Sequence, residues 1–236
     1  MSARKEPQPE QRRESCNAME QRTRQTKQGA SPHNAHIAPI ILASGSPRRL
    51  EILRTHGIEP VVVLPTIDED ALTALLSDAL APQQLAKELS LCKARSVLEK
   101  EKALTSPSRT QASLILAADT LVYHEDCGML GKPKDRDEAV SMLQRLCNTS
   151  HQVITGVTLI TISTEEETTF SDVTTVHFGS YSLRDIEHYI ATEPPLDKAG
   201  SYAIQGMWGR HVTALDGDLE NVIGLPYYRL EKLLRE

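Results

Sequence analysis

The segment Ser44-Gly45-Ser46-Pro47-Arg48-Arg49 brings two hydroxyl groups and two guanidinium groups together where an apolar run gives way to a helix. Free backbone N–H groups and the positive end of a helix favour anions, and the side chains add donors suited to phosphate oxygens. The segment therefore predicts a phosphate-binding turn that includes Ser44, Ser46 and Arg49. The alternative is a helix capped by Ser46 and followed by solvated arginines. A Walker loop is excluded, because G-x-x-x-x-G-K-[ST] is absent from the chain.

Asp119 follows the apolar run at residues 114–118. Its carboxylate is expected at the carboxyl end of a buried strand, where open α/β sheets bind ligands. Burial there would raise the pKa of the carboxyl group, and nearby cations would lower it. The position suits a general base or a metal ligand, and the alternative is an ordinary aspartate in a turn.

Lys93 lies on the same helical face as the apolar residues Ala86, Leu89, Cys92 and Val97. A lysine in such a stripe must extend its charge to solvent, pair with an acidic group, or reach a ligand. The first of these is the commonest outcome for a single lysine, so the helical position alone leaves the role of Lys93 open.

Three further residues are candidates on weaker signals. Glu69 belongs to Asp68-Glu69-Asp70, which is typical of a solvated turn but could supply carboxylate oxygens to Mg²⁺. Gln205 lies in a glycine-bounded stretch, and its amide could read the edge of a base because it offers both a donor and an acceptor; the alternative is a loop glutamine without a role. Lys132 lies in the stiff turn Gly131-Lys132-Pro133.

These residues must be positioned by alternating strands and helices. The expected strands cover residues 40–43, 61–64, 114–118 with an extended continuation to 123, 152–163, 168–178 and a short stretch near 212. The expected helices cover residues 48–56, 82–100, 135–147, 183–192 and a closing stretch from about 226. The mixture predicts one α/β domain at residues 39–236, with a mixed central sheet, flanking helices and two lobes around a cleft.

Residues 1–38 contain no Leu, Val, Phe, Tyr or Trp, so they cannot bury enough apolar area to offset their ordering entropy. We expect a disordered N-terminal extension. It carries seven Lys and Arg against four Asp and Glu, which leaves a net charge of about −9 on the rest of the chain. That balance, with 4% aromatic residues, argues against nucleic acid as a partner.

Composition also bears on the compartment. The longest strongly apolar stretches are far shorter than the roughly 20 residues that a membrane helix needs, so no membrane partner is expected. The four cysteines form no C-x-x-C pair, and no signal peptide opens the chain. We therefore expect a reducing, cytoplasmic compartment.

Taken in order, these segments resemble the Maf family of nucleoside triphosphate pyrophosphatases, also called septum formation inhibitor Maf proteins. The resemblance spans about residues 40–233 and rests on eight ordered motifs. They are Leu42-Ala43-Ser44-Gly45-Ser46-Pro47-Arg48-Arg49, Asp68-Glu69, Lys93-Ala94, Ala118-Asp119-Thr120, Gly131-Lys132-Pro133, the stretches 151–157 and 197–206, and Gly224-Leu225-Pro226.

The resemblance implies hydrolysis of the α–β phosphoanhydride of a nucleoside triphosphate, with Mg²⁺ or Mn²⁺, in the fold shared by Maf and inosine-triphosphatase-type enzymes. It implies Asp119 as the catalytic carboxylate, as a general base or a metal ligand. By the same resemblance, phosphate is bound by Ser44, Ser46, Arg49, Lys93 and Lys132, the metal by Glu69 and Asp119, and preference for dTTP and UTP is marked by Arg48, Thr120 and Gln205.

The sequence departs from the family pattern at a few positions, and alternative functions stay open beside this interpretation. Trp208-Gly209-Arg210-His211 stands where a smaller, glycine-rich stretch is expected, and Ser201 and Ala203 replace the commoner Ala and Gly, which leaves the shape of the base pocket undecided. The alternatives are a Maf-like pyrophosphatase for other or modified nucleotides, and a nucleotide-sensing division regulator without turnover. A homodimer is kept open as the oligomeric state.

Overall fold

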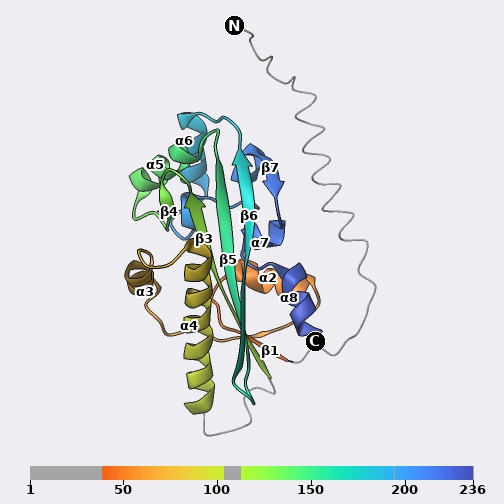
Figure 1. Cartoon of the computed structure of the whole chain (residues 1–236). Coiled ribbons are helices and arrows are strands. Elements are labelled where there is room, and N and C mark those ends of the chain that lie inside the picture. The colour runs from red at the N-terminus through yellow and green to blue at the C-terminus, as the bar shows by residue number, and fades with distance from the viewer. Residues whose placement is uncertain (1–38, 104–112, 194, 236) are drawn as a thin grey trace. The chain divides into compact units, whose positions relative to one another are not determined.

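The computed structural model describes residues 39–103, 113–193 and 195–235, so the predicted N-terminal extension lies outside the described residues. The described residues form a seven-stranded sheet in the order β2-β1-β3-β5-β6-β7, with β4 paired to β3 (Figure 1). The strands are β1 (Ile40–Leu42), β2 (Val61–Val62), β3 (Leu114–His124), β4 (Gly128–Leu130), β5 (Ser150–Thr161), β6 (Glu166–Phe178) and β7 (Val212–Asp216). Strands β2, β1 and β3 are parallel and the other pairings are antiparallel, which confirms the predicted mixed sheet.

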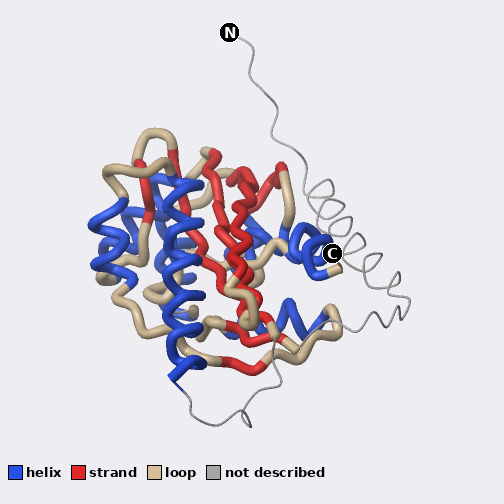
Figure 2. The backbone as a smooth tube through the Cα atoms, turned by 60° about the horizontal axis from the view of Figure 1, so that its bottom comes forward, coloured by secondary structure: helices blue, strands red, loops and turns tan. Residues whose placement is uncertain are grey.

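Helices cover both faces of this sheet. They are α2 (Pro47–Thr55), α3 (Glu69–Leu76), α4 (Pro82–Ala103), α5 (Arg136–Leu146), α6 (Leu183–Thr192), α7 (Leu219–Ile223) and α8 (Tyr227–Leu234), with short 3₁₀ turns at Ala199–Ser201 and Met207–His211. Helix α4 lies on one side of the sheet, and α2 and α8 lie on the other (Figure 1). Figure 2 shows α4 as the long helix lying along the strands. Among the described residues, none of these helices is long and apolar enough to cross a bilayer.

Strand β3 has an open stretch along one edge. Parallel β1 pairs with residues 114–116 on that edge, and antiparallel β4 pairs with residues 122–124. Between them, residues 117–121 have β5 on the opposite edge and no partner on this one among the strands that the structure describes. Asp119 and Thr120 therefore lie where β1 ends and the chain turns away toward α2, at a switch in strand direction of the kind that binds ligands in α/β sheets.

This placement corrects the prediction for Asp119. The residue lies in the middle of an 11-residue strand and not at its carboxyl end. Strand β3 continues because its pairing with β5 extends to Tyr123 and Gln152, beyond the apolar run that the sequence shows. The strand that ends beside Asp119 is β1, at Leu42.

Alternation along β3 sends neighbouring residues to opposite faces of the sheet. Ile115 and Ala117 pack with α4 in one apolar cluster, and Leu116 and Ala118 pack with α2 and α8 in another. Asp119 therefore belongs to the α4 face and Thr120 to the α2 face.

A third apolar cluster occupies the far part of the α2 face. It joins Val122 and Val153 to residues of α5, α6 and the 3₁₀ turn at Met207–His211. The polar residues Thr120 and Thr155, paired across β3 and β5, separate this cluster from the one beneath α2 and α8. The predicted two lobes correspond to these two apolar clusters on one continuous sheet. The part of the chain around the Val122 cluster, with α5, α6 and the loops at residues 131–133 and 197–206, is called the second lobe below.

Gly156 of β5 permits the close approach of α4. It pairs with Asp119 on the same face, and a Cβ atom at this position would lie 2.1 Å from the Ala86 carbonyl oxygen of α4. Helix backbone therefore rests directly on strand backbone at this point. Lys93 follows Ala86 by about two helical turns, so this contact sets how Lys93 meets Asp119.

Candidate active site

A pocket of about 500 Å³ opens at the unpaired edge of β3 and reaches both faces of the sheet. All ten residues that the sequence proposed for the site line this pocket: Ser44, Ser46, Arg48, Arg49, Glu69, Lys93, Asp119, Thr120, Lys132 and Gln205. They come from six separate parts of the chain: the β1–α2 turn with the start of α2, the start of α3, helix α4, strand β3, and the two loops that carry Lys132 and Gln205.

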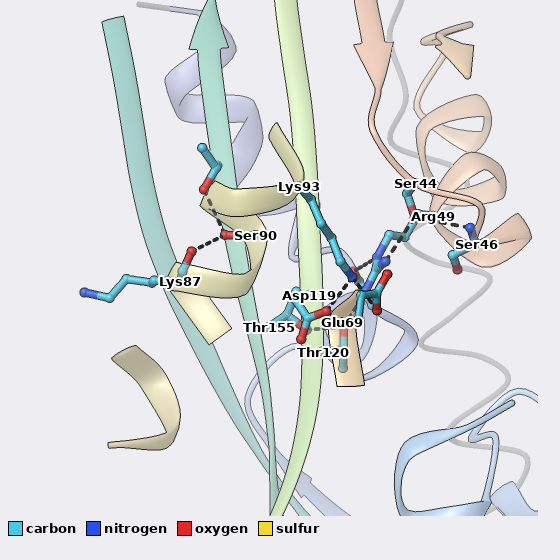
Figure 3. Close-up of polar contacts among 12 residues, drawn as sticks. Ser44, Ser46, Arg49, Glu69, Lys87, Ser90, Lys93, Asp119, Thr120 and Thr155 are labelled. Atoms are coloured by element: carbon cyan, nitrogen blue, oxygen red, sulfur yellow. Dashed lines mark hydrogen bonds and ion pairs between the residues drawn. The ribbon is translucent and has the colours of Figure 1, made fainter. Parts of the chain in front are cut away.

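On the α4 face, Lys93 joins two carboxylates. Its Nζ lies 2.6 Å from Asp119 Oδ1 and 2.9 Å from Glu69 Oε2 (Figure 3). Lys93 is 4% exposed and Asp119 is 7% exposed, so the contact is largely shielded from solvent. Of the three outcomes for a lysine in an apolar stripe, the structure shows pairing with acidic groups. The commonest outcome, in which the lysine extends its charge to solvent, does not hold for Lys93.

The acidic run beside Lys93 forms the N-cap and the first turn of helix α3, where Asp68 and Asp70 are exposed as expected and Glu69 is partly buried. Asp68 caps the helix, because its Oδ1 accepts the Ala71 N–H at 2.9 Å. Glu69 is then free to reach Lys93. The neighbouring carboxylates thus have separate roles, and only Glu69 of this run lines the pocket.

Arg49 is held by three segments of the chain. Its Nε donates to the Gly224 carbonyl at 2.9 Å, its Nη1 to Ser44 Oγ at 3.0 Å and its Nη2 to Thr120 Oγ1 at 3.0 Å. Burial lowers the pKa of the Arg49 guanidinium, and the charges of Asp119 and Glu69 oppose that shift. Because an arginine pKa starts far above neutrality, Arg49 stays a fixed cation against the pocket.

The turn before α2 differs from the prediction in one detail. Ser46 occupies the position before the helix but makes no side-chain capping hydrogen bond. Instead its own N–H donates to Ser44 Oγ at 3.2 Å. The Ser46 hydroxyl is therefore left for a ligand, beside N–H groups of the first turn that no side chain caps.

Arg48 contacts a residue to which sequence reasoning gave no role. Its Nη1 lies 3.7 Å from Asp197 Oδ2, and Lys198 Nζ lies 2.5 Å from the other oxygen of this carboxylate. Burial would raise the pKa of Asp197, but Lys198 and Arg48 lower it below its usual value. The contact joins α2 to the second lobe across the pocket, and Asp197 and Lys198 line it too.

The two remaining candidates are exposed at the pocket. Lys132 and Gln205 are both exposed side chains on loops of the second lobe. The wall near them on the α2 face is mainly apolar: Val122, Val153, Tyr202, Ile204, Val222 and Ile223. Burial raises the pKa of Tyr202, so its hydroxyl stays neutral. The pocket thus has a charged part at the sheet edge and an apolar part suited to a flat organic group.

Sequence reasoning missed two buried polar residues behind Thr120. Thr155 Oγ1 lies 3.0 Å from Thr120 Oγ1 and donates to the Asn221 carbonyl at 2.9 Å. Thr155 lies within the motif at residues 151–157, but its role is not visible there, because a threonine in a strand is ordinary and these contacts join segments far apart in the chain.

The fold and pocket define an α/β protein with a cationic, carboxylate-containing site at an open sheet edge. Residues 39–236 match the family of Maf-like proteins, and the chain belongs to this family.

Its relatives have related names. A dTTP/UTP pyrophosphatase of Symbiobacterium thermophilum is 42% identical over 197 residues, covering 84% of this chain and 93% of that protein. A dTTP/UTP pyrophosphatase of Alkaliphilus oremlandii is 39% identical over 196 residues, covering 83% and 94%. A nucleoside-triphosphatase / dITP/XTP pyrophosphatase structure from Mycobacterium abscessus is 16% identical, with a TM-score of 0.36 over 59% of this chain and 74% of that one.

Proposed function

We propose that this protein is a nucleoside triphosphate pyrophosphatase that hydrolyses dTTP and UTP to the monophosphate and pyrophosphate. The relatives named dTTP/UTP pyrophosphatase support the activity. The structural observation that carries the proposal is the buried contact of Lys93 with Asp119 and Glu69, next to the fixed Arg49 guanidinium. This arrangement suits a polyanion whose phosphoanhydride is to be attacked by water.

The cations of the pocket are assigned to the triphosphate. A triphosphate brings roughly four negative charges, and the described body of the protein is itself acidic, so local donors must hold it. Arg49 and the N-terminus of α2, with the Ser44 and Ser46 hydroxyls, form one side of the proposed phosphate site. Lys93 and Lys132 add charge from α4 and the second lobe.

The protein offers only part of the coordination shell that a divalent cation needs. Within the described residues, no group of three or more His, Cys, Asp or Glu side chains is placed to hold a metal ion. Asp119 and Glu69 nevertheless converge on one ammonium group, and Mg²⁺ is commonly held by one or two carboxylates together with substrate phosphates. We propose these two residues as its protein ligands, where Mg²⁺ or Mn²⁺ would supply positive charge opposite the triphosphate.

Asp119 is proposed to accept a proton from the attacking water. The water oxygen bonds to the α-phosphorus, the bond from this phosphorus to the α–β bridging oxygen breaks, and pyrophosphate leaves with the electron pair. Lys93 positions the Asp119 carboxylate through the 2.6 Å contact. Arg49 faces the charge that develops on the phosphate oxygens.

A screen of pyrophosphate release tests the activity and its base preference. With Mg²⁺ or Mn²⁺, we expect kcat/KM for UTP and dTTP at least roughly tenfold above ATP and GTP, which is about 1.4 kcal/mol in transition-state binding. Gln205→Ala should narrow this gap more than it lowers the rate on poor substrates, because the amide pairs with the pyrimidine edge. Equal or better turnover of purine triphosphates, 7-methyl-GTP included, contradicts the base preference. Binding without pyrophosphate release contradicts the activity.

Removal of residues 1–38 tests the domain boundary. The family match begins at residue 39, and every proposed site residue follows it. We therefore expect the truncated protein to keep the thermal midpoint and the turnover of the full chain. A midpoint lower by several degrees, measured by calorimetry, would show that the segment docks on the domain.

We also propose a cytoplasmic location. Cys92, Cys127 and Cys147 are free thiols in the structure, as expected for a reducing compartment. The substrate is then a nucleotide of the cytoplasmic pool, and the proposed partner is this small molecule.

A further inference from the structure

A line of hydrogen bonds runs from the pocket into the interior on the α2 face. Arg49 Nη2 donates to Thr120 Oγ1 at 3.0 Å, and Thr120 Oγ1 lies 3.0 Å from Thr155 Oγ1. Thr155 Oγ1 in turn donates to the Asn221 carbonyl oxygen at 2.9 Å. Thr120 and Thr155 are directly paired across β3 and β5, so the contact is built into the strand register (Figure 3).

The direction of each bond follows from what the groups can donate. A carbonyl oxygen only accepts, so the single hydroxyl hydrogen of Thr155 is used by Asn221. Thr155 Oγ1 must then accept the hydrogen of the Thr120 hydroxyl. A guanidinium group only donates, so Thr120 Oγ1 accepts from Arg49. Thr120 is left with no hydrogen for the pocket and with one lone pair that can accept.

The inner end of this line is rigid. Thr155 and Asn221 are both 0% exposed. The Asn221 amide donates to the Val153 carbonyl and to Thr174 Oγ1, each at 3.0 Å. Because these bonds hold α7 against β5 and β6, the acceptor that orients the Thr155 hydroxyl cannot turn away without breaking them.

We propose that Thr155 is a positioning residue that holds the Thr120 hydroxyl as a hydrogen-bond acceptor toward the nucleoside. The inference rests on the proposed function. Thr120 lies between the fixed guanidinium of Arg49 and the apolar wall that begins at Val122, two residues further along the same strand face. It is thus placed beside the part of the nucleotide that follows the phosphates. The donors that thymidine triphosphate offers there are the N3–H of the base and the sugar 3′-hydroxyl.

The experiment removes each donor from the substrate and the positioning group from the protein. We measure kcat/KM for dTTP, N3-methyl-dTTP and 2′,3′-dideoxythymidine triphosphate with the wild-type protein, Thr155→Val and Thr155→Ser. For the wild type we expect kcat/KM to be at least tenfold lower for one of the two analogues than for dTTP. The analogue with the lower kcat/KM identifies the donor that Thr120 accepts. Thr155→Val removes the acceptor of the Thr120 hydrogen at nearly equal volume, so this loss should shrink below threefold. Thr155→Ser keeps the hydroxyl and should retain the wild-type ratio.

A second variant covers a failure of Thr155→Val to fold. Thr120→Val removes the accepting hydroxyl itself and should abolish the same discrimination. The inference is overturned if the wild type tolerates both analogues within threefold, or if a folded Thr155→Val or Thr120→Val protein keeps the tenfold loss. Calorimetric affinities for the three nucleotides give the same ratios independently of turnover. A wild type that binds dTTP and discriminates against one analogue but releases no pyrophosphate would refute the proposed function and leave this inference standing.

Discussion

Replacing Asp119 with asparagine is expected to lower kcat by about 10²–10⁴, the usual contribution of a general base. Asparagine keeps the size of the side chain but cannot take a proton from water, and it loses the charge that pairs with Lys93 at 2.6 Å. Steady-state pyrophosphate release from dTTP and UTP measures the change. The thermal midpoint of the variant shows whether the fold is intact.

Asp68→Asn is a matched control for this substitution. It makes the same chemical change near the site, but Asp68 caps α3 and does not line the pocket, and asparagine caps helices about as well as aspartate. We expect turnover of this control close to the wild-type value. Near-normal turnover in a folded Asp119→Asn protein would remove Asp119 from the catalytic assignment.

Gly156→Ala is expected to have the largest effect on stability. The added Cβ would lie 2.1 Å from the Ala86 carbonyl oxygen, and two backbones cannot separate here without disturbing the pairing of β3 with β5 or the packing of α4. We expect the free energy of unfolding to fall by about 3 kcal/mol. The Gly156→Ala protein that does fold should also lose turnover, because the displaced helix α4 would move Lys93 away from Asp119.

Gly131→Ala provides the comparison for that result. Gly131 has no atom within 4 Å of the position of an added Cβ, so the same change should alter the free energy of unfolding by less than about 0.5 kcal/mol. Urea denaturation of both variants measures the difference. Equal stability of Gly156→Ala and the wild type would show that α4 does not rest on β5 as the structure has it.

Much of the fold could be predicted because local patterns dominate it. Helix α6 begins at a capping box of Ser182 and Asp185 that is visible in the sequence, and α4 begins at Pro82 as expected. The long strands β5 and β6 follow from runs of β-branched residues. The short elements β4, α3 and α7 were not expected, since their few residues depend on neighbours that are distant in sequence.

The candidate site was predictable as a set of residues but not as an arrangement. Chemistry-bearing side chains in ordered motifs identified ten of the residues that line the pocket, and their individual roles remain predictions. Their contacts could not be predicted, because they depend on strand register and helix packing. The pairing of Lys93 with Asp119 needs α4 against β5, and the buried Thr155 is recognisable only once β3 and β5 are aligned.

Asp119 and Thr120 are adjacent in sequence but lie on opposite faces of β3. The proposed catalytic contacts and the proposed nucleoside preference therefore lie on different faces of the sheet, and evolution can alter one without the other. Substitutions among Thr120, Thr155 and the apolar wall can change which nucleoside fits while Lys93 keeps its contacts with Asp119 and Glu69. The same arrangement makes the chain intolerant of insertions. A single residue added within β3 before Asp119 would move its carboxylate beneath α2 and present a neighbouring side chain to Lys93. We therefore expect members of this family to diversify by substitution around the nucleoside and to keep the length of this strand constant.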